Sequence, residues 1–234
     1  IVFGDWSSDV CSSDLTLCER RCLSLVGESG SGKTTLARCI AGLHQHKIVG
    51  DIEFMGKPLA RDARDRPRAT RQAIQYIFQS PYSSLNPRKT IRQILAAPLK
   101  VFFDLSRDEM EARMEKALEQ VALDASLLNR YPDQLSGGQR QRVAIARGLA
   151  AEPTVLVCDE VTSWLDVSVQ AAIIDLLANL QREMGLSMLF VTHNLALVRS
   201  ISQEVAVMNE GRIVEFGGVD AVLEDPQADY TKKL

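Results

Sequence analysis

A chain of 234 residues can form one large domain or two small ones, and an apolar share of 46% with a charged share of 24% is typical of a globular protein. A net charge of −3 argues against a dedicated nucleic-acid binder, which usually carries a basic face. No apolar run approaches the ~20 residues that span a bilayer and no secretory signal is recognisable, so we expect any membrane role to come through a partner.

The opening stretch Asp5–Leu15, DWSSDVCSSDL, differs from the rest of the chain. It is dense in Ser and Asp and has neither a helical nor a strand period. It resembles the one-frame translation of a common sequencing-library adapter. We therefore expect residues 1–15 to be a non-native tract, with native sequence resuming near Leu15–Leu17. A natural disordered arm is the alternative.

The next third of the chain predicts a strand, a turn and a helix, followed by a small strand pair. The apolar run Cys22–Val26 predicts a buried strand, and the pattern after the Gly-rich turn predicts a helix over Lys33–Leu43. IVGDIEFMGKPL predicts two short strands around Met55–Gly56. The mixed charges of Arg61–Arg71 indicate a solvated surface, and AIQYIFQ predicts a buried strand that ends at Gln79.

The remaining residues return to an alternation of strands and helices after a long helical stretch. Helices are predicted from Thr90 to about Val121, over about Gln139–Ala150 and near Val167–Glu183. TVLVCDE and SMLFVTH predict buried strands, and EVAVMNEGRIVEF predicts a hairpin with Glu210–Gly211 at its turn. This order predicts an α/β core with a helical subdomain inserted in it.

A phosphate-binding loop is predicted where the first buried strand meets its helix. GESGSGKT fits the pattern G-x-x-x-x-G-K-[ST], whose glycines let backbone N–H groups turn toward phosphate oxygens. Lys33 supplies a charge for the β- and γ-phosphates, Thr34 offers a hydroxyl to Mg²⁺, and the helix directs its N-terminus at the anion. We therefore predict a nucleoside-triphosphate site formed by Gly27, Glu28, Ser29, Gly30, Ser31, Gly32, Lys33, Thr34 and Thr35.

The motif LSGGQ predicts a second anion site. Its residues are Leu135, Ser136, Gly137, Gly138 and Gln139, with Ser136 as the expected cap of a Gly-rich helix N-terminus. Two anion sites far apart in one chain are explained if they meet across two subunits. Here the sequence resembles the ATP-binding-cassette (ABC) ATPases, whose signature motif is LSGGQ. The resemblance implies that the signature of one subunit closes on the γ-phosphate bound by the Walker A loop of the other.

The same resemblance implies roles for four more residues. TVLVCDE resembles the Walker B strand, which implies Asp159 as a Mg²⁺ ligand and Glu160 as the residue that polarises the attacking water. Consecutive strand residues face opposite sides, so one carboxylate would face the metal and the other the nucleophile. His193 matches the switch histidine that contacts the γ-phosphate. Gln79 matches the Q-loop glutamine, which binds Mg²⁺ and water and senses the transmembrane partner.

The resemblance runs from about Leu17 to the C-terminus. It implies an α/β fold with a P-loop (RecA-like) nucleotide-binding core, a small antiparallel β subdomain and a helical signature subdomain at about residues 86–150, within an ATPase domain of residues 16–234. SPYSSLNPR, CDEVTS and EDPQADYTKKL resemble the dipeptide/oligopeptide/nickel importer ATPases, although ADYT departs from their more usual HPYT. Many of these continue past the Tyr-Thr segment, so we expect a C-terminal extension to be truncated.

Two aromatic residues depart from the family pattern. ABC ATPases normally begin with antiparallel strands and an aromatic residue that stacks on adenine. Trp6 lies at that place, but its surroundings fit no part of the pattern, so we expect the stacking residue to be absent from this sequence. Trp164 stands in the D-loop, Ser163-Trp164-Leu165-Asp166, where the subgroup usually has Ala. We expect its indole to hinder the close approach of a second subunit.

The resemblance implies an ATP- and Mg²⁺-dependent ATPase subunit that powers import of peptides or a related small solute at the cytoplasmic face of the membrane. Its implied partners are a second ATPase subunit, transmembrane permeases and, indirectly, a periplasmic or extracellular solute-binding protein, with no nucleic acid. One alternative is an ABC ATPase that acts on DNA or ribosomes, but long coiled-coil, zinc or basic inserts are not visible. A catalytically silent nucleotide switch is the other, against which Glu160 and His193 argue.

Overall fold

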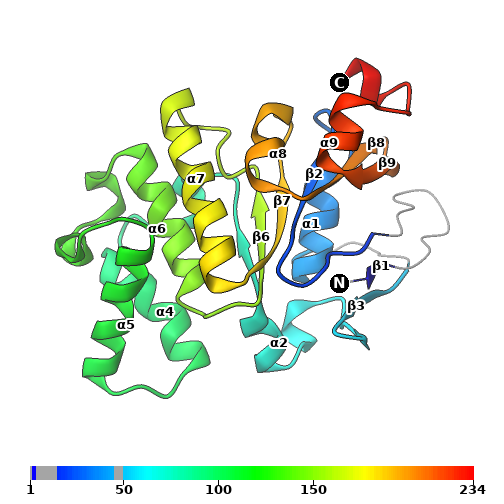
Figure 1. Ribbon diagram of the computed structural model, residues 1–234. Coiled ribbons are helices and arrows are strands. Elements are labelled where there is room, and N and C mark those ends of the chain that lie inside the picture. Colours follow the sequence, from blue (N-terminus) through cyan, green and yellow to red (C-terminus); the bar gives the residue numbers. More distant parts are fainter. Residues whose placement is uncertain (1, 4–14, 45–49) are drawn as a thin grey trace.

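The computed structural model describes residues 2–3, 15–44 and 50–234 (Figure 1). None of the helices in these ranges is long and apolar enough to cross a membrane. In chain order the helices and strands are β1 (Val2–Phe3), β2 (Cys22–Val26), α1 (Lys33–Ala41), β3 (Ile52–Phe54), β4 (Lys57–Pro58), α2 (Arg68–Ala73), β5 (Ile74–Ile77), α3 (Pro81–Ser84), α4 (Ile91–Phe102), α5 (Arg107–Gln120), α6 (Gly137–Leu149), β6 (Val155–Asp159), α7 (Val167–Met184), β7 (Ser187–Val191), α8 (Leu195–Ile201), β8 (Glu204–Asn209), β9 (Arg212–Gly218) and α9 (Val219–Glu224).

The main sheet has six strands in the order β5-β6-β7-β2-β8-β9. The first five are parallel, and β9 returns antiparallel to β8 through the predicted hairpin. In the registers of β2 with β7 and of β7 with β6, Leu25 pairs with Val191 and Val191 pairs with Asp159. The carboxyl ends of these three strands therefore lie side by side at one edge of the sheet.

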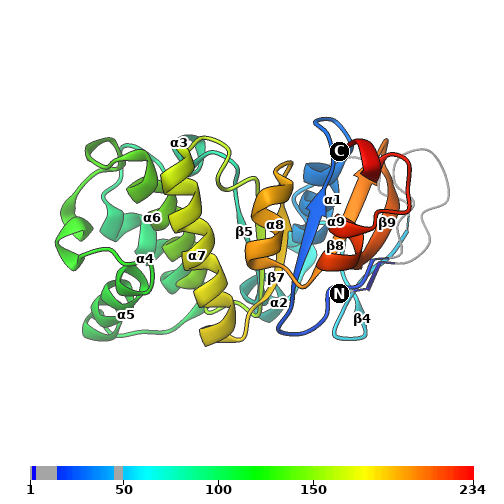
Figure 2. The same cartoon turned by 45° about the horizontal axis from the view of Figure 1, so that its top comes forward.

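The strands β2, β6 and β7 of the main sheet are buried on both faces, as their uninterrupted apolar sequences require. In β6, Val155 and Val157 belong to the apolar cluster that contains the buried residues of α1. The intervening Leu156 and Cys158 belong to the cluster that contains the buried residues of α4 to α7. Figure 2 shows α7 and α8 in front of the strands and α1 on the other side. The predicted α/β core is confirmed.

The helical subdomain lies between the adjacent strands β5 and β6 in sequence, and at one end of the sheet in space (Figure 1). Two of its helices begin with a capping box, in which Thr90 pairs with Gln93 before α4 and Ser106 pairs with Glu109 before α5. Their buried residues share one cluster with α6. The predicted insertion of a helical subdomain into the core is therefore confirmed.

The small antiparallel sheet has the strand order β1-β3-β4. Its β3–β4 turn is built on Met55 and Gly56, whose φ angles of 54° and 72° lie in the left-handed region. Phe3 pairs with Ile52. Residues 4–14, with Trp6 among them, lie outside the described residues, so the origin of the tract 1–15 stays a prediction.

Three predicted element boundaries shift by two residues. Helix α1 ends at Ala41 rather than Leu43, because Gly42 caps it in the left-handed conformation. The fifth strand of the chain, β5, ends at Ile77 rather than Gln79, because its last pairing partner is Cys158 and Gln79 turns toward the loop that follows β6. Helix α6 begins at Gly137 rather than Gln139, because Ser136 caps it.

Arg66 contradicts the prediction that all of Arg61–Arg71 is solvated surface. Only 4% of Arg66 is exposed. Its guanidinium donates hydrogen bonds to the backbone oxygens of Ile40 at 2.7 Å, Cys39 at 3.3 Å and Ala60 at 2.7 Å. Two of these carbonyls belong to the last turn of α1, where carbonyls run out of helical partners, although that of Cys39 also accepts a hydrogen bond from the Gly42 N–H at 3.0 Å. Arg66 therefore closes the C-terminal end of the helix that follows the phosphate-binding loop.

Candidate active site

The predicted phosphate-binding loop joins the end of β2 to the start of α1. Gly27 has a φ of 146°, and a Cβ placed on it would lie 2.1 Å from the backbone oxygen of Met208 on β8. No other residue fits that position without displacing a strand. Gly32, the last residue before α1, has a φ of 103° and is also in a conformation that favours glycine. The loop conformation thus depends on glycine at both of its ends.

Lys33 is buried at the centre of this loop, with 4% of its surface exposed. Its Nζ donates hydrogen bonds to the backbone oxygens of Gly27 at 2.8 Å and Glu28 at 2.7 Å and to Ser31 Oγ at 3.2 Å. Burial lowers the pKa of Lys33, and the nearby carboxylates of Glu160 and Asp159 oppose that shift. The amine is thus held by oxygen atoms, which phosphate oxygens could replace.

Asp159 ends β6 beside the loop, with 1% of its surface exposed. Both of its carboxylate oxygens accept a hydrogen bond: Oδ1 from Thr34 Oγ1 at 3.0 Å, and Oδ2 from the Tyr76 hydroxyl at 2.5 Å. The first bond joins the phosphate-binding loop to β6. A buried carboxylate needs such partners, so both oxygens are fixed in direction.

Tyr76 was not predicted as a site residue. Burial, and then the charge of Asp159, raise the pKa of Tyr76, so its hydroxyl stays protonated and donates. One signal was present in the sequence: Tyr76 is the one residue with a hydroxyl in the apolar strand text IQYIF, and a buried tyrosine hydroxyl needs a partner. That signal identifies a polar contact but not which residue supplies it.

Glu160 follows Asp159 and is surrounded by three polar side chains. Its Oε2 accepts hydrogen bonds from Gln79 Nε2 at 2.9 Å and Ser163 Oγ at 3.1 Å, and its Oε1 lies 3.4 Å from His193 Nδ1. The Glu160 side chain is 16% exposed, whereas that of His193 is 57% exposed. Three of the predicted site residues, Gln79, Glu160 and His193, are therefore brought together.

The prediction that strand alternation separates the carboxylates of Asp159 and Glu160 was wrong. Glu160 is not an extended strand residue: its φ is 46°, and its N–H donates to the Val191 backbone oxygen at 3.0 Å. The backbone turns into the left-handed region directly after Asp159. This turn, rather than strand alternation, gives Asp159 and Glu160 different partners.

The oxygen donors beside the loop fit a magnesium ion. Thr34 supplies a hydroxyl, Asp159 a carboxylate and Gln79 an amide oxygen. Such hard oxygen ligands are the ones Mg²⁺ prefers, and it usually binds one or two protein carboxylates together with substrate phosphates. The three residues that were predicted as metal ligands therefore have suitable chemistry and lie around one loop.

The signature residues form a capped helix N-terminus at the start of α6. Ser136 Oγ accepts a hydrogen bond from the Gln139 N–H at 3.2 Å, and Gln139 Oε1 accepts one from the Ser136 N–H at 3.0 Å, while Leu135 is buried beneath them. Within the described ranges, no hydrogen bond joins residues 135–139 to residues 27–35. Figures 1 and 2 place α6 and α1 on opposite sides of α7. The signature and the phosphate-binding loop are thus separate in one chain.

The signature glycines and the predicted D-loop are neighbours. A Cβ placed on Gly137 would lie 3.7 Å from Leu165 Cδ2, and one on Gly138 would lie 2.8 Å from Val169 Cγ1. In the D-loop, Ser163 binds Glu160, Leu165 packs against the core, and Asp166 precedes α7. Trp164 is 66% exposed. Trp164 is therefore largely exposed on its own chain, and the next residue, Leu165, is the one that lies beside the signature.

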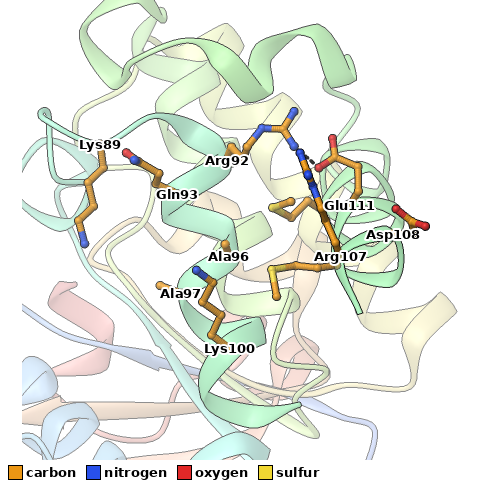
Figure 3. Close-up of a pocket in the computed structure, with 11 residues that line it drawn as sticks. Lys89, Arg92, Gln93, Ala96, Ala97, Lys100, Arg107, Asp108 and Glu111 are labelled. Atoms are coloured by element: carbon orange, nitrogen blue, oxygen red, sulfur yellow. Dashed lines mark hydrogen bonds and ion pairs between the residues drawn. The ribbon is translucent and has the colours of Figure 1, made fainter. Parts of the chain in front are cut away.

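A separate pocket lies between α4 and α5 in the helical subdomain (Figure 3). Arg92 and Glu111 form an ion pair across it. None of the predicted site residues lines the pocket. Its charged lining residues are Lys89, Arg92, Lys100, Arg107, Asp108 and Glu111.

Known proteins that are similar to this chain belong to transport systems. The family model described as ABC transporter matches residues 11–163, which is more than half of the chain. Oligopeptide transport ATP-binding protein OppF of Escherichia coli (strain K12) is 48% identical over 221 residues, which cover 94% of this chain and 66% of that protein. This chain thus spans just under two thirds of the length of that relative.

Solved structures of similar fold include the cbiO1 protein from Clostridium perfringens, described as part of the ABC transporter complex cbiONQ. It matches with a TM-score of 0.82 and 28% identity, over 96% of this chain and 88% of that one. The ATP-binding cassette MJ0796, solved as a dimer in a post-hydrolysis state bound to ADP and Pi, matches with a TM-score of 0.78 and 28% identity, over 93% of this chain and 96% of that one. The predicted fold class is therefore confirmed.

Replacing Tyr76 with Phe tests the contact that the sequence did not predict. The substitution removes the hydroxyl that orients Asp159 Oδ2 and leaves the ring. Partners of a metal ligand typically contribute 10–100-fold to metal affinity. We expect Tyr76→Phe to weaken binding of ATP with Mg²⁺ by about tenfold and to leave binding of ATP in EDTA unchanged, in titrations with a fluorescent nucleotide. An equal loss with and without Mg²⁺, or no loss, would contradict this role.

Proposed function

The chain belongs to the ABC transporter family, and from this premise we propose that it is the ATP-binding and ATP-hydrolysing subunit that powers an importer of peptides or a related small solute. One observation carries the proposal: Lys33, Asp159, Glu160 and His193 come from three adjacent strand ends and converge on one loop. The name of its OppF relative, an oligopeptide transport protein, supports the choice of solute class.

Nucleotide binding follows from the loop and its buried amine. The N-terminus of α1 and backbone N–H groups of the loop after Glu28 favour an anion at this place. Lys33 would exchange the backbone oxygens of Gly27 and Glu28 for phosphate oxygens. Mg²⁺, when bound, would neutralise charge on the β- and γ-phosphates, and Thr34, Asp159 and Gln79 would hold it.

We assign hydrolysis of ATP to Glu160 and the polar side chains that contact it. Its carboxylate would accept a proton from the water that attacks the γ-phosphate, and general-base assistance of this kind contributes typically 10²–10⁴-fold. Gln79 and Ser163 donate to one oxygen of Glu160, which fixes the orientation of the carboxylate. His193 is more exposed than Glu160 and would contact the γ-phosphate from the outer side.

A second ATPase subunit completes the proposed site. Residues 135–139 lie apart from the phosphate-binding loop in one chain, so their helix N-terminus would bind the γ-phosphate held by another subunit. The dimeric state of the MJ0796 relative supports this arrangement. The site would then contain Walker A and Walker B residues of one subunit and the signature of its partner.

The remaining partners follow from the transport role. We propose that the chain is peripheral at the cytoplasmic face of the membrane and contacts transmembrane permease subunits through the loop after Gln79 and the helical subdomain. Because Gln79 donates to Glu160, a permease that moves this loop would also move a hydrogen bond of the hydrolytic residue. A periplasmic or extracellular solute-binding protein would act indirectly, through the permeases.

Replacing Glu160 with Gln tests the proposed hydrolytic role. The amide cannot accept a proton from water, so we expect turnover of ATP to fall by at least about 100-fold while ATP affinity stays within about twofold. The ATP-bound dimer should accumulate in size-exclusion chromatography. Glu210→Gln, in the β8–β9 turn, is the matched control and should hydrolyse ATP as the unmodified chain does. Hydrolysis by Glu160→Gln at the parental rate would contradict the assignment.

The side chain of Trp164 affects the stability of the proposed dimer. Trp164 is 66% exposed, so its own core does not accommodate it, and it precedes Leu165, which lies beside the signature that would face the partner. An extra side chain in a packed interface costs typically about 1–3 kcal/mol, which corresponds to about 5- to 150-fold in dimer population. We propose that Trp164 weakens the closed dimer.

Replacing Trp164 with Ala should therefore raise steady-state ATPase activity and increase the ATP-bound dimer fraction in a Glu160→Gln background. Met55→Ala, at an exposed apolar side chain in the β3–β4 turn, is the control and should change neither quantity. Dimer fractions from size-exclusion chromatography with ATP decide the matter. If Trp164→Ala leaves the fraction unchanged or lowers it, the interface tolerates or uses the indole.

A further inference from the structure

The C-terminal segment, residues 225–234, contacts the phosphate-binding loop. The backbone N–H of Glu28 donates a hydrogen bond to the Tyr230 hydroxyl oxygen at 3.0 Å. These residues are 202 positions apart in the sequence. Figures 1 and 2 both show the C-terminal end of the chain, in red, beside the end of β2, in blue. A residue from the far end of the chain thus contacts the loop at its second position.

The segment is attached to the core on both sides of this contact. Glu215 on β9 accepts hydrogen bonds from the N–H groups of Gln227 at 2.7 Å and Ala228 at 3.2 Å. Tyr230 and Leu234 pack against an apolar cluster that includes Val26, the last residue of β2. Tyr230 is therefore held by an apolar cluster to which the strand that leads directly into the loop contributes.

Glu28 connects Tyr230 to Lys33. Its N–H donates to Tyr230, and its carbonyl oxygen accepts a hydrogen bond from Lys33 Nζ at 2.7 Å. The Tyr230 hydroxyl thus fixes the backbone of the residue whose carbonyl orients the buried amine. A loop that is already ordered loses less conformational entropy when an anion binds, so its affinity is higher.

We propose that Tyr230 is a positioning residue for the phosphate-binding loop and that docking of the C-terminal segment raises the affinity for a nucleoside triphosphate. This inference rests on the nucleotide site of the proposed function. Coupling between two binding events is reciprocal. Nucleotide binding should therefore stabilise the docked segment by the same factor by which the docked segment strengthens nucleotide binding.

The first test compares Tyr230→Phe with the unmodified chain. The substitution keeps the ring packed against the apolar cluster that includes Val26 and removes only the hydroxyl. A single neutral hydrogen bond corresponds to about 2- to 10-fold in affinity, and because Glu28 is exposed to water we expect about threefold weaker MgATP binding. The kcat should stay within about twofold, so the effect falls on KM. Tyr131→Phe, at another partly exposed tyrosine, is the matched control and should bind as the unmodified chain does.

The second test measures reciprocity by hydrogen exchange of residues 228–234. With the non-hydrolysable analogue MgAMP-PNP, exchange in this segment should slow in the unmodified chain and slow less in Tyr230→Phe. Equal MgATP affinity of the two proteins, together with equal slowing, would overturn the inference. Failure of both to bind MgATP would instead overturn the proposed function and this inference with it.

Discussion

Parallel pairing of β2, β7 and β6 is the constraint on which the site depends. Because Leu25, Val191 and Asp159 lie in one row across these strands, the segments that follow them emerge at the same edge. The phosphate-binding loop follows β2, Glu160 follows β6 and His193 follows β7. Only the backbone ladder brings together side chains that are more than 100 residues apart in sequence. In an open parallel sheet, ligands bind at this carboxyl edge.

The segments that follow β2 and β6 at this edge begin with different backbone conformations. Gly27 allows the loop to pass close to the Met208 carbonyl, where a Cβ would collide. Glu160 turns through a left-handed conformation and donates its N–H to Val191, the last residue of β7. Left-handed φ at a residue other than glycine is uncommon and is often found at functional sites. The strained backbone position at Glu160 thus coincides with the residue to which we assign the proton transfer.

Local sequence signals predicted most of the fold. Apolar runs such as Cys22–Val26 and the strand after Glu152 are buried on both faces, and such runs indicate parallel strands without reference to any partner. The cap at Ser136 was also predicted, because it depends on residues three positions apart. The phosphate-binding loop with Lys33 could likewise be assigned, because its eight residues are consecutive in the sequence.

Contacts between distant segments could not be predicted in this way. Arg66 looked like one charge among many, and its partners are carbonyls at the end of α1. The hydroxyls of Tyr76 and Tyr230 bind Asp159 and Glu28, and only the assembled fold gives those distances. The left-handed turn at Glu160 was missed because an apolar strand pattern does not indicate at which residue the strand ends. All of these contacts except that of Arg66 lie at the loop or at the strand ends beside it, so the sequence predicted the site residues better than their supports.

Nucleotide affinity of Lys33→Ala tests the central claim most directly. Lys33 is the buried cation of the loop, and calorimetric titration with MgATP measures its contribution without requiring turnover or a partner. The account predicts tight binding by the unmodified chain and by Lys116→Ala, an exposed lysine on α5, and a loss of at least about 100-fold in Lys33→Ala. Circular dichroism would establish that the variant is folded. Unchanged affinity in folded Lys33→Ala would contradict the account.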